Sequence, residues 1–154
     1  MEQEQDKCVQ VIEETMPRGL AANTAAILGI TLGRQGPDLV GENVADRAGN
    51  IHPGIIRTLV PVLSGGPEVF QTLRRRLGEP EFSAVAAVDF TDLAQRCRTY
   101  GEYMEKMSAA APEDLRYLGL ALRGPRHQVD RLTGSLPLLR WTREMGRGAR
   151  MART

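Results

Sequence analysis

The stretch between residues 8 and 33 places the tightest constraint on how this chain can fold. Residues 8–12 are apolar and rich in β-branched side chains, which predicts a strand too apolar for a half-exposed edge position. Pro17 and Gly19 then break the strand, because proline fixes its own φ and glycine permits a sharp turn. From Leu20 to Leu32, apolar and small residues recur at steps of three and four. This spacing predicts a helix that packs closely on a sheet.

The start of this helix is the first candidate site. Its free N–H groups and its dipole can hold an anion or an oxyanion. Arg18 and Gly19, in the turn, are therefore candidate substrate-binding residues, and Asn23 is a candidate catalytic residue that can orient a carbonyl group. An ordinary strand–helix unit, in which Asn23 only bonds the preceding loop, explains the same residues.

Length and composition predict a single cytoplasmic domain. The chain has 154 residues, which is enough for one domain with a substantial core. No apolar run approaches the roughly 18 residues of a membrane span, and the first residues are acidic instead of basic as in a signal peptide. The two cysteines, Cys8 and Cys97, fall in apolar patterns and predict no disulfide framework, metal site or cofactor.

Charge is distributed unevenly along the chain. We divide it into a flexible acidic leader (1–7), one α/β domain (8–139) and an arginine-rich basic tail (140–154). The net charge is +1, and the tail contributes +4, so the rest of the chain carries about −3. The domain itself has one basic cluster, the triplet Arg74–Arg76. A protein that binds a polyanion usually carries more basic surface on its folded body.

Strand patterns alternate with helix patterns along the domain, which is typical of an α/β fold with helices on both faces of one sheet. The four strands are expected over residues 8–12, 58–63, 82–90 and 117–122, and the helices over 20–32, 67–77, from about 92 to 107 with an interruption near 99–102, and 128–132. Pro61 predicts an edge position for the second strand. The continuous apolar run of the third strand predicts a central one. The long segment between residues 34 and 50 is polar and rich in glycine, and it predicts a loop.

Three further polar residues follow predicted strands or turns. His52 lies in a Gly/Pro loop and is a candidate acid or base; a loop histidine without a chemical role is the alternative. Asp89 ends an apolar strand, where an ionised carboxylate needs a partner or a raised pKa; a helix cap is the alternative. Thr91 is a candidate substrate-binding residue or the N-cap of the next helix.

Several phrases of the sequence resemble a known bacterial family, domain of unknown function 2000. They include Met16–Asn23, Gly49–Gly54, Val88–Thr91, Thr99–Tyr103, Leu118–Pro125 and Leu132–Leu138. The resemblance covers roughly residues 8 to 140. It implies a fold similar to the type II peptidyl-tRNA hydrolases, a three-layer α/β/α domain with a four-stranded mixed sheet that is often dimeric.

The sequence differs from the type II peptidyl-tRNA hydrolases at the start of the first helix. The type II peptidyl-tRNA hydrolases have Lys-Gly-Lys in the loop where this chain reads Arg18-Gly19-Leu20. Arginine can clamp a phosphate or carboxylate but cannot act as a titrating base. Asp89 resembles the family's aspartate in position, with no lysine near it in sequence. A tRNA partner is therefore possible but not favoured.

Two classes of function remain open at this point. The first is a small enzyme acting on an acyl, ester or amide bond of an anionic or carbonyl-bearing metabolite, with His52, Asp89 and Asn23 as catalytic residues. The second is a module that binds a small molecule or a protein without turnover. In both cases we expect a homodimer, and a site in one cleft between the first helix and the loops carrying His52 and Asp89.

Overall fold

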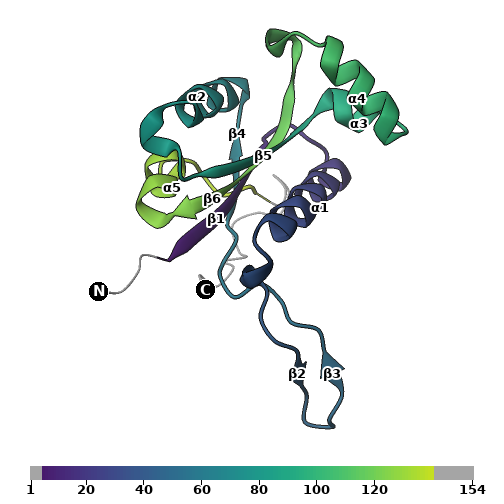
Figure 1. Ribbon diagram of the computed structural model, residues 1–154, viewed down its shortest axis with the longest axis vertical. Coiled ribbons are helices and arrows are strands. Elements are labelled where there is room, and N and C mark those ends of the chain that lie inside the picture. The colour runs from purple at the N-terminus through teal and green to yellow at the C-terminus, as the bar shows by residue number, and fades with distance from the viewer. Residues whose placement is uncertain (1–4, 141–154) are drawn as a thin grey trace.

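The sheet of this protein has four strands and is mixed. The computed structural model describes residues 5–140. The strands are β1 (Asp6–Glu13), β4 (Val62–Gly65), β5 (Ala86–Thr91) and β6 (Tyr117–Pro125). Their order is β4–β1–β6–β5, with β4 parallel to β1 and β6 antiparallel to both of its neighbours (Figure 1). The predicted α/β fold with a four-stranded mixed sheet is confirmed.

Helices cover both faces of the sheet (Figure 1). One face packs against α1, and the other against α2 and α5. The remaining helices, α3 and α4, follow the carboxyl end of β5. The helical segments are α1 (Arg18–Gln35), η1 (Pro37–Leu39), α2 (Pro67–Leu77), η2 (Pro80–Phe82), α3 (Asp92–Arg96), α4 (Tyr100–Ala109), η3 (Pro112–Asp114) and α5 (Arg126–Thr133). No helix within residues 5–140 is long and apolar enough to cross a membrane.

The central position of β1 follows from its side chains. Successive residues of a strand point to opposite faces, and both faces of β1 are apolar. Val9 and Val11 pack toward α2 and α5, whereas Cys8 and Ile12 pack beneath α1. All four are at most 1% exposed, as the apolar run predicted.

The order of the strands corrects one prediction and confirms another. β5 lies at an edge of the sheet, so the central position expected for residues 82–90 is wrong. Within β5, Phe90 is buried, Ala87 and Val88 are partly buried, and Ala86 is exposed. β4 is the other edge strand, as Pro61 predicted, and residues 137–139 partly cover it through the bonds Ser64 N–Pro137 O and Leu139 N–Val62 O, each 2.9 Å.

Both ends of the predicted domain can be compared with the structure. β1 begins at Asp6, so the strand includes two residues that we expected in the leader. Asp6 and Lys7 are paired with Pro125 and Gly124 of β6, and Lys7 also pairs with Asp130 of α5 at 2.5 Å. The basic tail from residue 141 onward lies outside the described residues.

A hairpin stands where the sequence predicted a polar loop. It contains β2 (Val44–Ala45) and β3 (Ile51–His52), which are antiparallel, and a bridge between Val40 and Ile56 closes its base. We call residues 40–56 the arm. Gly49 allows the turn at its tip because its φ of 87° is in the left-handed region. The arm follows the C-terminal end of α1 and projects away from the sheet (Figure 1).

Candidate functional site

The carboxyl ends of three strands and the starts of three helices lie together at one end of the sheet, which we call its carboxyl edge. β1, β4 and β5 all run in the same direction, so their carboxyl ends lie at the same edge. α1, α2 and α3 begin directly after these strands. In open α/β sheets this edge is where ligands bind.

Asp89 is the best-placed acidic group at this edge. It shares a face of β5 with Ala87, which packs in the core beneath α2. Its Oδ2 lies 3.9 Å from Nη1 of Arg74 on α2, and its side chain is 31% exposed. The sequence predicted that this carboxylate needs a partner, and Arg74 supplies it from a distant helix.

Two tyrosines lie near this ion pair. The guanidinium carbon of Arg74 is 5.9 Å from the ring centre of Tyr117, which stacks on Phe70. Burial raises the pKa of Tyr103 on α4, and the negative charge of Asp89 raises it further. Tyr103 therefore stays a neutral hydrogen-bond donor near neutral pH. We call Asp89, Arg74, Tyr103 and Tyr117 the strand-end cluster.

Glu13 is a buried carboxylate that the sequence analysis missed. Its side chain is 4% exposed, accepts hydrogen bonds from the backbone N and the hydroxyl of Thr15, and lies 3.8 Å from Arg116. It faces the same side of the sheet as Val11, two residues earlier. The signal was present, because Glu13 ends an apolar strand as Asp89 does. Its hydrogen bonds fix the turn into α1.

The predicted residues of α1 lie apart from Asp89. Arg18, Gly19 and Asn23 are all exposed at the start of α1. α1 covers the face of the sheet opposite to α2, so these residues and Asp89 lie on different sides of the sheet. The N-terminus of α1 has no side-chain cap and no acidic residue in its first turn. It remains available to an anion, but not as part of the strand-end cluster.

His52 is farther away still. It lies in β3 of the arm, which follows the C-terminal end of α1, and 18 helical residues separate that end from Arg18 by about 27 Å. Its Nε2 is 3.0 Å from Oδ2 of Asp46. The hydrogen bond from His52 is the largest cause that lowers the pKa of Asp46, to about 2, followed by the bonds from Asn50. The single cleft expected for His52, Asp89 and α1 does not form within one chain.

Thr91 has a structural role. The sequence left a cap and a substrate contact open, and the structure shows the cap: its Oγ1 accepts a hydrogen bond from Ala94 N at 3.3 Å. The residue is 1% exposed, so it does not face a space that a substrate can enter.

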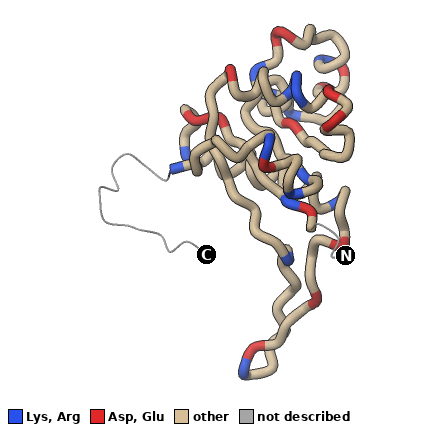
Figure 2. The backbone as a smooth tube through the Cα atoms, turned by 90° about the vertical axis from the view of Figure 1, so that its left-hand side faces the viewer, with Lys and Arg blue, Asp and Glu red and all other residues tan. Residues whose placement is uncertain are grey.

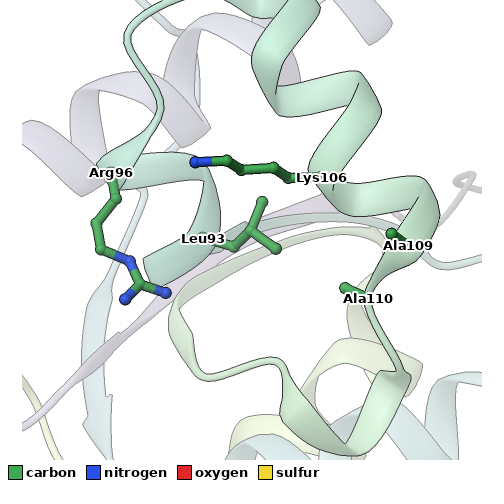
Figure 3. A pocket seen from close by; sticks show the side chains of 5 residues that line it. All are labelled: Leu93, Arg96, Lys106, Ala109 and Ala110. Carbon is green, nitrogen blue, oxygen red and sulfur yellow. The ribbon is translucent and has the colours of Figure 1, made fainter.

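An open hollow of about 440 Å³ lies between α3 and α4. Leu93, Ala109 and Ala110 form its apolar side, and Arg96 and Lys106 extend along its other side (Figure 3). Each cation has a partner on its own helix, since Arg96 is 3.7 Å from Asp92 and Lys106 is 2.7 Å from Glu102. No member of the strand-end cluster lines this hollow. The described part of the chain also has no group of three or more His, Cys, Asp or Glu side chains that could hold a metal ion.

Comparison with known proteins identifies a family but no activity. A protein of unknown function from Agrobacterium tumefaciens strain C58, Atu0240, has a similar structure, with a TM-score of 0.77 at 20% identity over 86% of this chain and 96% of that one. At this identity the likeness shows the fold alone. None of the curated proteins matches the sequence. The family model for proteins of unknown function called DUF2000 matches residues 6–140, and the chain belongs to this family.

Proposed function

We propose that this protein is a small cytoplasmic enzyme with a fold like that of the type II peptidyl-tRNA hydrolases, acting on an acyl, ester or amide bond. The substrate is a small molecule with an anionic or carbonyl group, and it binds at the strand-end cluster. The observation that supports this most is the partly exposed carboxylate of Asp89, which lies at a strand end beside a cation and near a neutral phenol.

Each member of the cluster has a chemical role in such a reaction. The carboxylate of Asp89 takes a proton from the attacking water, as a general base. The phenol of Tyr103 donates a hydrogen bond to the oxygen on which negative charge develops. Arg74 holds an anionic group of the substrate, since its planar guanidinium matches a carboxylate or phosphate.

A non-catalytic binding module is the second candidate. The ion pair with Arg74 favours it, because a partly exposed pair of this kind also forms in proteins without any catalytic role. The hollow between α3 and α4 favours it as well, because this concave surface does not include Asp89.

A kinetic comparison separates the two candidates. The full chain is assayed with a panel of small carboxylate-bearing esters, thioesters and amides, by proton release for the esters and thioesters and by release of the free amine for the amides. We expect turnover with at least one of them, and a loss of about 10²- to 10⁴-fold in Asp89→Asn. The matched control is Asp114→Asn, an exposed acid in η3, which we expect to keep full activity.

Two results count against the enzyme. Saturable binding of these compounds without turnover supports the binding module. Turnover that is equal in Asp89→Asn and the native chain shows that the reaction takes place elsewhere on the molecule.

A further inference from the structure

The arm exposes apolar side chains that no other part of residues 5–140 covers. Val40, Val44, Ile51 and Ile55 are 45%, 60%, 66% and 80% exposed. Val44 pairs with His52, and the next pair joins Ala45 to Ile51, so Val44 and Ile51 point to opposite faces of the ribbon. Two strands alone are marginally stable in water. An arm with apolar residues on both faces is therefore expected to pack against another surface.

The outer face of α1 is a second uncovered apolar surface. Residues 19–33 contain no charged side chain. The face turned away from the sheet carries Ala22, Ala26 and Ile30, all exposed, with Ile30 at 75%, and one polar side chain, Asn23. A mainly apolar outer face, with an isoleucine as exposed as Ile30, is normally covered by a partner. The outer face of α1 therefore also lacks a partner.

We propose that the arm of one chain lies along the outer face of α1 in a second copy, in a two-fold symmetric homodimer. The lengths match: eight extended residues make an arm of about 25 Å, and α1 is about 27 Å long. A ribbon about 10 Å wide covers about 250 Å² of helix. Two such contacts, counted on both partners, bury about 1,000 Å², which is at the lower limit for a biological interface.

A second copy is the partner because one chain presents both surfaces and cannot join them itself. The arm leaves the C-terminal end of its own α1 and points away from the rest of the fold (Figures 1 and 2). Neither surface has a net charge pattern that would select an acidic or basic partner, and much of the arm is free of charged residues (Figure 2). A two-fold dimer covers both surfaces of both chains at once. This dimer does not require strand pairing along the outer edge of β4, which residues 137–139 already occupy in part.

Symmetry fixes the direction of the arm. Each arm starts at the C-terminal end of its own α1, so in a two-fold dimer these two ends face each other. An arm that continues away from its own chain therefore has its base beside the C-terminal end of the partner's α1. The tip of the arm lies beside the start of that helix. This arrangement brings His52 and Asp46 of one chain toward Arg18 and Asn23 of the partner subunit, residues that a single chain keeps apart.

The first test measures the mass in solution by light scattering. We expect the native chain at tens of micromolar to have twice the mass of one 16.9 kDa chain. Ile55→Asp in the arm and Ile30→Glu in α1 should each give monomers with native far-UV circular dichroism, because both side chains are exposed. Met104→Glu is the matched control: it removes a side chain that is 61% exposed on α4, and the dimer should persist. A monomeric native chain, or a dimer that survives both substitutions, overturns the proposal.

The second test measures the direction by disulfide crosslinking. Cys97→Ser provides the background, since Cys8 is fully buried. In this background we combine Ala48→Cys, at the tip of the arm, either with Asn23→Cys near the start of α1 or with Arg34→Cys in its last turn. We expect mild oxidation to crosslink two chains at least tenfold faster with Asn23→Cys than with Arg34→Cys. Equal rates, or faster crosslinking with Arg34→Cys, contradict the proposed arrangement.

Discussion

Arg74 of α2 reaches Asp89 of β5 across one face of the sheet, with 3.9 Å between Nη1 and Oδ2. The two side chains are 42% and 31% exposed, so solvent screens the pair and its contribution to stability is at most about 1 kcal/mol. The importance of the pair is that it places a negative and a positive group side by side at the carboxyl edge of the sheet. That edge is where we place the reaction, and the phenol of Tyr103 reports on its electrostatics.

We predict that Asp89→Asn lowers the pKa of Tyr103. Burial is the larger cause of its raised pKa and remains in the variant, so the value should stay above the ordinary value of about 10. The phenolate absorbance followed against pH measures this, and Tyr103→Phe identifies the signal. Because the folded pKa is raised, Tyr103 contributes stability below pH 10, which is lost as the pH rises through the folded value. An unchanged titration in Asp89→Asn would show that the two groups do not interact.

The tip of the arm yields a second prediction. The hydrogen bond from His52 is the largest cause of the lowered pKa of Asp46, about 2. We predict that His52→Ala raises this pKa toward the usual value near 4, while the bonds from Asn50 keep it somewhat below. A carboxyl ¹³C titration by NMR measures both proteins.

The sign of the pH effect follows from the lowered pKa. The hydrogen bonds of Asp46 stabilise the tip above about pH 4, and this contribution is lost as the pH falls through about 2. His52→Ala should therefore make the tip lose its structure at a higher pH, seen in the amide resonances of Ala48 and Asn50. Identical acid transitions in the two proteins would contradict the role of His52.

Local sequence determined most of the fold. The apolar run in β1 predicted a central strand, Pro61 predicted an edge, and the helix pattern over 67–77 matches α2. These features depend on residues close together in the chain. The order of the strands depends on contacts between distant segments, and an apolar run predicts buried faces without giving the number of neighbouring strands. For that reason the position of β5 was predicted wrongly.

The candidate site was harder to predict for the same reason. Asp89 was identified from its place at a strand end, but Arg74 comes from another helix, and only the packed structure shows that they meet. His52 and Arg18 were expected in one cleft because both were placed in loops at the carboxyl ends of strands. The glycines and turn signals between residues 41 and 54 instead form a hairpin. Gly54 supports this, since a Cβ atom there would collide with the backbone of Gly41 and Glu42 on the facing strand.

A third prediction concerns how closely α1 packs on the sheet. A Cβ atom at Gly119 of β6 would lie 2.7 Å from Cγ2 of Thr24 and 2.9 Å from Cδ1 of Leu28, both buried on α1. We predict that Gly119→Ala lowers the free energy of unfolding by about 1–3 kcal/mol, because the helix must move away. Urea denaturation followed by circular dichroism measures it.

The control for this prediction is a glycine with free space around it. A Cβ atom at Gly33, near the end of α1, would meet no neighbouring group within 4 Å. Gly33→Ala should raise the free energy of unfolding by about 0.5–1 kcal/mol, since alanine favours the helix. If Gly119→Ala were as stable as the native chain, the close packing of α1 would not depend on this glycine.

The last prediction is that intact peptidyl-tRNA is a poor substrate. Two of the three arginines in the triplet are engaged within the fold: Arg74 with Asp89, and Arg76 with the carbonyl of Arg131 at 3.1 Å and with the ring of Phe82. Binding tRNA requires several free cations, because the gain comes from counterions released at each neutralised phosphate. The other arginines of the folded body are scattered along the sequence and form no second basic cluster, so any binding should depend on the basic tail. We therefore expect weak, salt-sensitive cleavage at most in the full chain, and none after truncation behind Leu139. Cleavage of peptidyl-tRNA by the truncated protein at the rate of the full chain would contradict this, and would place a tRNA site on the sheet and helices themselves.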